Sequence, residues 1–148
     1  MAGTIRWLRI SYWVGAVTDG LAALQMLFPP LFAFGMGLPA FDPGSDYRYA
    51  MGMGASLMLG WTALLLWADR KPLERKGVLL LSVFPVIAGL AANEAYAVAA
   101  GFLPLAAVLP IWALQAALAA LFLVSYWRAR AQHEPSPVSS VRSSIRER

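Results

Sequence analysis

The sequence predicts an all-α integral membrane protein, built as an antiparallel bundle of four helices with both termini in the cytoplasm. The composition is 59% hydrophobic and 14% charged, with a mean hydropathy of +0.60, whereas soluble domains carry about 25% charged residues. The apolar residues gather in four stretches of roughly 20 residues, the length that crosses a hydrocarbon layer of about 30 Å. The basic residues gather at the ends of those stretches. Apolar side chains are therefore expected to face lipid as well as the interior.

The composition also excludes several kinds of site. The chain has no Cys, which rules out disulfides, thiolate metal ligands and a cysteine nucleophile. Its one His, His133, lies in the polar segment 132–148, so no histidine-based catalytic or metal site can be built within the helices. We expect one domain over residues 1–131 and a disordered cytoplasmic tail over 132–148, which has too little apolar surface to fold. The sequence indicates neither a metal nor a cofactor.

The first span is expected from about residue 5 to 28, where Pro29 and Pro30 stop a helix because neither residue has an amide hydrogen. A cleaved signal peptide is the competing interpretation, but the stretch is longer than a signal core and carries Asp19 in its middle. We therefore expect an uncleaved span. The apolar segment 31–41 is too short to cross a bilayer, so we expect it to lie in the membrane interface or to fold back against the helices.

The second span is expected over residues 47–68 and has one face almost without side chains. Gly52, Ser56 and Gly60 recur at every fourth residue, and such small residues let neighbouring helices approach closely in a membrane. These three residues form the predicted helix-packing face. The short charged connection 69–76 then joins this span to an antiparallel neighbour.

The third span, over residues 77–100, contains Pro85. Proline removes one backbone hydrogen bond and kinks a helix, so we expect a kink in which a neighbouring helix or a hydroxyl, with Ser82 as the candidate, satisfies the freed carbonyl. The fourth span is expected over residues 103–127.

The orientation follows from the distribution of basic residues. Lys and Arg near the ends of spans are retained in the cytoplasm, and a cytoplasmic N-terminus places all but Arg48 on that side. An even number of spans then puts the C-terminus in the cytoplasm too, in the inner membrane of the cell. The eleven basic residues on that side are Arg6, Arg9, Arg70, Lys71, Arg75, Lys76, Arg128, Arg130, Arg142, Arg146 and Arg148.

Asp19 is the first polar residue that a bilayer should reject, since it lies about 15 Å from either end of its span. Keeping it ionised there costs about 2.5–3.5 kcal/mol, and protonating it at pH 7 costs about 4 kcal/mol from its reference pKa. The protonation state of Asp19 therefore depends on a partner residue or on a polar pocket. Candidate partners at similar depth are Gln115, Ser56 and Thr18. Two interpretations stay open: a hydrogen bond that sets helix register, and a proton-linked or ligand-binding carboxylate.

Glu94 is the second intramembrane acid, about 10 Å from the outer end of the third span. Arg48, the one outer basic residue, can reach toward it. One interpretation is a polar pocket that opens outward beneath the segment 31–41. The alternative is that Arg48 pairs with a nearby Asp in water while Glu94 extends to the interface. The predicted pocket comprises Gln25, Arg48, Asn93, Glu94 and Tyr96.

The order of these segments resembles the DoxX-like group of small four-helix prokaryotic membrane proteins. The resemblance covers roughly residues 5–127: a first span that ends in Pro, a short apolar outer segment, and an Arg that opens a Gly-rich second span (Arg48, Gly52, Gly54 and Gly60). It implies a four-helix membrane fold. Members of the group have been linked to quinone-related or thiosulfate-related redox work, and no catalytic residue of the group maps onto this chain.

Three functions are consistent with the sequence. The first is a membrane protein that binds a lipophilic molecule, a quinone or a lipid, or that serves as an accessory subunit or homo-oligomer through the predicted packing face. The second is a proton-coupled transporter that uses Asp19 or Glu94. The third, which we favour less, is a membrane enzyme with these acids as acid and base. A nucleic-acid partner is not expected, because the basic residues lie at span ends rather than in one patch.

Overall fold

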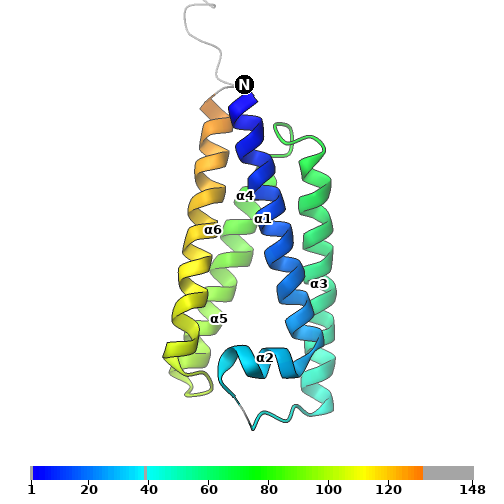
Figure 1. The fold of residues 1–148 in the computed structure, drawn as a ribbon, viewed down its shortest axis with the longest axis vertical. Coiled ribbons are helices and arrows are strands. Elements are labelled where there is room, and N and C mark those ends of the chain that lie inside the picture. Colours follow the sequence, from blue (N-terminus) through cyan, green and yellow to red (C-terminus); the bar gives the residue numbers. More distant parts are fainter. Residues whose placement is uncertain (1, 39, 132–148) are drawn as a thin grey trace, which may run out of the picture.

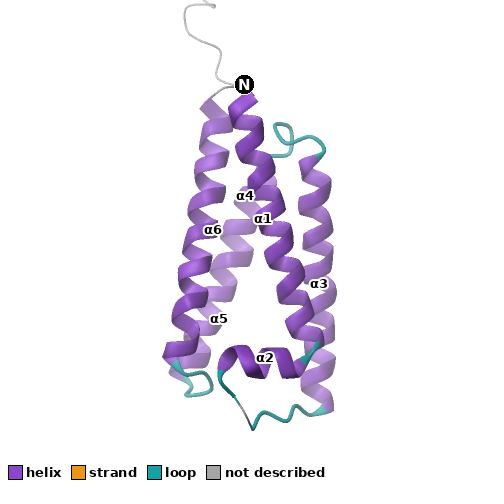
Figure 2. Ribbon diagram, in the orientation of Figure 1, coloured by secondary structure: helices purple, strands orange, loops and turns teal. Residues whose placement is uncertain are grey.

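The structure is a computed structural model that describes residues 2–38 and 40–131. The predicted disordered tail at 132–148, including His133, lies outside the described residues. All regular secondary structure in the described part is helical, as predicted (Figure 2). The elements are α1 (Ala2–Leu27), α2 (Pro29–Met36), α3 (Ser45–Asp69), α4 (Gly77–Leu81), the π-helical segment η1 (Ser82–Ile87), α5 (Ala88–Ala99) and α6 (Leu105–Ala131).

The long helices lie side by side along one axis (Figure 1). Segments α4, η1 and α5 follow one another without a break and form one rod, Gly77–Ala99. The start of α1, the connection 70–76 and the end of α6 lie at one end of the molecule, which we call the basic end. Helix α2 and the connection between α5 and α6 lie at the opposite end, which we call the α2 end.

Three helical rods are long and apolar enough to cross a membrane: Ser45–Asp69, Gly77–Ala99 and Leu105–Ala131. Helix α1 qualifies only together with α2, from which it is bent by 107°, so the total is three spans or up to four. At most 22% of the residues in the most apolar window of each of the three rods are buried. Large apolar side chains face outward instead, and Leu57 is 75% exposed. Apolar surface of this extent favours lipid as the surrounding medium.

The largest buried cluster joins all four rods between the middle of the molecule and the basic end. It contains Leu8 and Tyr12 from α1, Leu65 from α3, Leu79 from α4 and Phe122 from α6. Toward the α2 end the second cluster has only three buried members, Ala23, Ala55 and Met58, from α1 and α3. Tight packing of the rods is thus concentrated in the basic half.

Hydrogen bonds between the rods strengthen the same half. The hydroxyl of Ser11 in α1 donates to that of Ser125 in α6 over 2.8 Å, and both residues are buried. The indole Nε1 of Trp61 in α3 donates to the Ser82 hydroxyl of η1 over 3.0 Å. Such bonds are retained in an apolar medium because the alternative is an unpaired polar group.

Pro85 lies inside η1, which widens the third rod locally. The amide of Ala88 donates to the carbonyl of Val83 five residues back, as well as to that of Pro85. The expectation for Ser82 was wrong in detail, because its hydroxyl donates to the Val78 carbonyl over 3.0 Å. The π-helical turn, rather than a serine side chain, adapts the backbone to a residue without an amide hydrogen.

Helix α2 folds back across the end of the molecule, as expected for the short apolar segment after Pro30 (Figure 1). Its Phe32 belongs to an aromatic cluster with Phe41 and Tyr47, at ring-centroid distances of 5.1–6.3 Å. Phe102, in the connection between α5 and α6, extends the cluster at 6.4 Å from Phe41. The aromatic rings thus tie α2 to the ends of the neighbouring rods.

The predicted packing face of α3 has no partner within the described chain. A Cβ atom added at Gly52 or Gly60 would meet nothing within 4 Å, apart from the helix's own backbone. Ser56 is exposed, and its hydroxyl donates to the Gly52 carbonyl of its own helix. Helix α3 instead turns Ala55, Met58 and Leu65 inward. The packing prediction therefore remains open for a contact with another molecule.

Candidate functional site

The candidate site is a polar cluster between α5 and α6 that we call the Glu94 cluster, comprising Glu94, Trp112 and Gln115. The amide Nε2 of Gln115 donates to both carboxylate oxygens of Glu94, over 3.0 and 3.1 Å. Gln115 is only 8% exposed, and Glu94 is half-buried. Because the Gln115 amide donates to both oxygens, it orients the Glu94 carboxylate between two helices that are otherwise apolar.

The Glu94 cluster keeps two buried polar atoms without hydrogen-bond partners among the described residues. They are the Gln115 Oε1, an acceptor, and the Trp112 Nε1, a donor that lies beside the Glu94 carboxylate without hydrogen-bond geometry. Leaving such a group buried and unpaired costs about 1–3 kcal/mol. The cluster is therefore a place where a molecule that both accepts and donates hydrogen bonds would gain free energy on binding.

The spacing of α6 explains why Gln115 points inward. Its buried residues follow one stripe at intervals of three, four or seven, which is the period of one helical face. Gln115 occupies a position on this stripe, three residues before Leu118 and seven after Val108. Trp112 lies three residues before Gln115 and thus one turn away on the same side. The stripe in α6 comprises Val108, Gln115, Leu118, Phe122, Ser125 and Ala129.

Asp19 is half-buried in α1, one turn after the buried Gly15 and one turn before the buried Ala23. Within the described chain it makes no hydrogen bond or ion pair. The partners expected for it are engaged elsewhere: Gln115 binds Glu94, and the Thr18 hydroxyl donates to the Val14 carbonyl. Ser56 likewise donates within its own helix.

Asp19 nevertheless lies at nearly the same depth as the Glu94 cluster. Ser11 contacts Ser125, and α1 runs away from the basic end while α6 runs toward it (Figure 1). Asp19 follows Ser11 by eight residues and Gln115 precedes Ser125 by ten, so their depths differ by about 3 Å at helical rise. Two carboxylic acids therefore share one level of the molecule.

The larger predicted pocket is not assembled as expected. Arg48 makes no ion pair with a described residue, and its Nε donates to the Pro43 carbonyl over 3.3 Å at the α2 end. Asn93 is exposed, and Tyr96 is 74% exposed. The reason is helical rotation: residues one before and two after Glu94 are turned about 100° and 200° away from it, so they face outward when Glu94 faces α6.

Gln25 is also apart from the Glu94 cluster. It is exposed, and its Nε2 lies 3.9 Å from where a Cβ would stand on Gly35 in α2. Of the predicted site residues, the structure thus brings together Glu94 and Gln115. Trp112 was missed by the sequence reasoning, although its position one turn before Gln115 was the signal that could have found it.

Arginine and tryptophan pair repeatedly at the basic end. The Arg75 guanidinium lies over the Trp67 ring at 3.3 Å from its centroid, and Arg130 lies over Trp127 at 5.5 Å. Arg128 of α6 also covers Trp7 of α1 at 5.5 Å. Indole rings and arginines are both favoured at the level of lipid head groups.

The Glu94 cluster offers hydrogen-bonding groups of both kinds to a ligand. Its carboxylate and the Gln115 carbonyl are acceptors, and the Trp112 indole is a donor. Searches of protein-family models, curated proteins and solved structures with this chain found no match.

Proposed function

We propose that this protein binds a lipophilic molecule with a hydrogen-bonding head group, of the quinone or lipid class, at the Glu94 cluster. The observation that carries the proposal is that the Gln115 acceptor and the Trp112 donor, both buried beside Glu94, have no hydrogen-bond partner among the described residues. A quinone carbonyl would accept from the Trp112 indole, and a quinol hydroxyl would donate to Gln115 or Glu94. Such a ligand reaches the cluster from the lipid, because the surrounding surface of α5 and α6 is largely apolar and exposed.

The proposal includes an arrangement in the membrane. Four antiparallel spans cross the inner membrane, α1 being the first, with both termini in the cytoplasm and α2 in the outer interface. The Arg–Trp pairs at the basic end and the apolar outer surface of α2, where Phe34 is 91% exposed, support this placement. The membership in the DoxX-like group that the segment order implies is part of the same proposal.

The absence of native cysteines makes the arrangement directly testable. Single cysteines replace Glu74, at the basic end, and Asp42, at the α2 end. A membrane-impermeant maleimide added to intact cells should label Asp42→Cys and spare Glu74→Cys until the membrane is opened. The reverse pattern would refute the orientation, and equal labelling of both in intact cells would refute the four spans.

The binding proposal is tested with decylubiquinone as the probe, titrated into the full-length protein in lipid nanodiscs and followed by calorimetry. Gln115→Leu removes both the bond to Glu94 and the free acceptor, and should weaken binding about two- to tenfold, the range of one hydrogen bond between neutral groups. Asn93→Leu is the matched control, because Asn93 neighbours Glu94 but is exposed. Equal affinities of wild type and Gln115→Leu would refute the site.

A second candidate function is proton-coupled transport, and one observation favours it. Asp19 is half-buried at the level of Glu94 without a described hydrogen-bond partner, and intramembrane acids of this kind often carry protons. Asp19→Asn should then abolish a pH-gradient-driven flux of a lipophilic cation such as ethidium into proteoliposomes and leave decylubiquinone binding intact. If the flux persists in Asp19→Asn, or is absent in wild type, this function is excluded.

For both candidate functions we also propose a protein partner. The open face of Gly52, Ser56 and Gly60 is available for a second copy of the chain or for a subunit of a larger membrane complex.

A further inference from the structure

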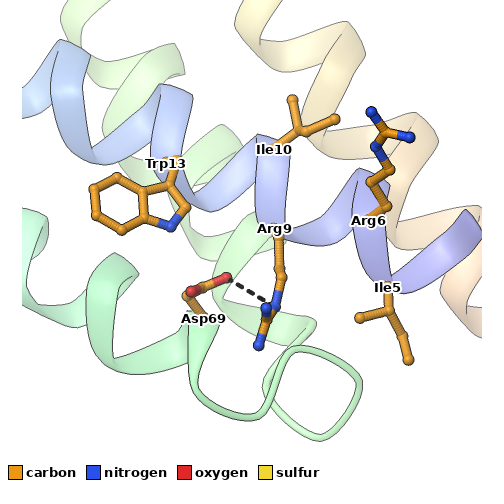
Figure 3. Close-up of a pocket in the computed structure, with 6 residues that line it drawn as sticks. All are labelled: Ile5, Arg6, Arg9, Ile10, Trp13 and Asp69. Carbon is orange, nitrogen blue, oxygen red and sulfur yellow. Dashed lines mark ion pairs between the residues drawn. The ribbon is translucent and has the colours of Figure 1, made fainter. Parts of the chain in front are cut away.

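A concave surface lies at the basic end of α1, far from the Glu94 cluster. It is an open groove of about 690 Å³ on the outside of the helices (Figure 3). Two kinds of side chain line it, cationic and apolar, together with one acid from the end of α3. The lining residues are Ile5, Arg6, Arg9, Ile10, Trp13 and Asp69.

Arg9 forms an ion pair with Asp69 at the edge of this groove. Its Nε lies 3.7 Å from the Asp69 Oδ1, and Figure 3 shows the two side chains directed toward each other. The Asp69 Oδ1 is buried, whereas the Arg9 side chain is 58% exposed. The terminal nitrogens of Arg9 have no partner among the described residues. A guanidinium whose Nε faces a carboxylate leaves these two nitrogens as a fork that matches two oxygens of a phosphate.

An apolar stripe continues from Arg9 along α1. Trp13, Val17 and Leu21 follow at intervals of four residues, and all three are exposed. From Arg9 to Leu21 the helix rises about 18 Å, close to half of a hydrocarbon layer of about 30 Å. A head group at Arg9 therefore places its acyl chain along this stripe through the depth of one leaflet.

The excess of positive charge at the basic end favours an anionic head group. Asp69 and Glu74 are the only acids among the described residues of the basic end, against a larger number of basic side chains. Arg6, one turn before Arg9 in α1, also lines the groove and adds a second positive charge (Figure 3). The basic residues are Arg6, Arg9, Arg70, Lys71, Arg75, Lys76, Arg128 and Arg130.

We propose that this groove binds an anionic phospholipid of the cytoplasmic leaflet, with its phosphate on Arg9 and one acyl chain along Trp13 and Val17. The assignment to the cytoplasmic leaflet depends on the proposed orientation of the chain, whereas the anionic chemistry of the lipid does not. The groove is remote from Gln115. Loss of phospholipid binding at the groove should therefore leave decylubiquinone binding unchanged, and the two proposals can be refuted separately.

Native mass spectrometry of the full-length protein tests the proposal. Micelles receive phosphatidylglycerol or phosphatidylcholine with the same palmitoyl and oleoyl chains, and the fraction of protein that retains each lipid is measured. Wild type should retain phosphatidylglycerol preferentially. Arg9→Gln should weaken that retention about five- to tenfold, the range expected for one basic residue at an anionic surface. Millimolar inorganic phosphate should not displace the lipid, because it lacks the acyl chain.

The matched control is Arg130→Gln, which removes the same charge at the same end but outside the groove. If it lowers retention as much as Arg9→Gln, binding is diffuse and the groove is refuted. Equal retention of the two lipids, or displacement by phosphate, refutes the proposal as well. If Arg9→Gln fails to fold, Trp13→Ala decides, since it keeps every charge: reduced retention of phosphatidylglycerol supports the groove, and wild-type retention overturns it.

Discussion

The substitution Gly15→Ala should destabilise the protein, and its cost can be estimated from three atoms. A Cβ at Gly15 would stand 2.8 Å from Cζ of Phe122 and 3.1 Å from Cδ1 of Leu65. Phe122 is 3% exposed and Leu65 is fully buried, so neither side chain borders the outer surface into which it could swing. Overpacking of this kind costs about 1–3 kcal/mol, while Gly to Ala gains about 1 kcal/mol of helix propensity. The net loss in the free energy of unfolding is therefore about 1 kcal/mol.

The assay is unfolding in mixed micelles with increasing SDS, followed by circular dichroism. Gly20→Ala is the matched control in the same helix, because its Cβ would lie 4.0 Å from Thr62 Cγ2, an ordinary contact. It should be neutral or stabilising. Phe122→Leu removes the ring atom that clashes, so it should suppress the effect of Gly15→Ala in a double-mutant cycle. If Gly15→Ala is as stable as Gly20→Ala, the close approach of α1 to α3 and α6 is refuted.

Two further outcomes test the contacts between helices. Ser11→Ala and Ser125→Ala should each lower the free energy of unfolding by about 0.6 kcal/mol, because interhelical hydrogen bonds in membranes average that value. The double mutant should show a coupling energy of similar size. Additive effects in the same SDS assay would contradict the bond. Gly52→Leu and Gly60→Leu should leave the unfolding free energy of the monomer nearly unchanged, since both positions open onto free space, and should reduce cross-linked dimer in native membranes. A large loss of monomer stability would show that α3 packs through this face within the chain.

The all-helical fold and the positions of the long apolar segments could be predicted from the sequence, because they depend on composition along the chain. The apolar lengths predicted the three rods that are long and apolar enough to cross a membrane, and the first long helix, expected to end at residue 28, ends at Leu27 in the structure. Pro29 and Pro30 stop α1 by covalent geometry, and no tertiary contact is needed for that. The 107° turn into α2 follows at the same place.

The rotation of each helix about its axis could not be predicted in the same way. In water an apolar stripe marks the buried face, but in lipid both faces are apolar, so that contrast is lost. The choice of Gly52, Ser56 and Gly60 as the packing face of α3 shows the consequence, since Ala55 and Met58 face the core instead. For the same reason the predicted pocket is not assembled: Glu94 faces α6, whereas its neighbours in the chain, Asn93 and Tyr96, face outward.

The uneven packing along the molecule bears on how the proposed ligand would enter. In the basic half the four rods share one buried cluster, and the hydrogen bonds Ser11–Ser125 and Trp61–Ser82 join them in pairs. Toward the α2 end the second cluster is small, and the Glu94–Gln115 bond joins only α5 to α6. Regions with few buried contacts open at lower free-energy cost than a well-packed core. A ligand that approaches from the lipid would therefore displace α5 and α6 from α1 at the α2 end, while the basic half keeps the rods together.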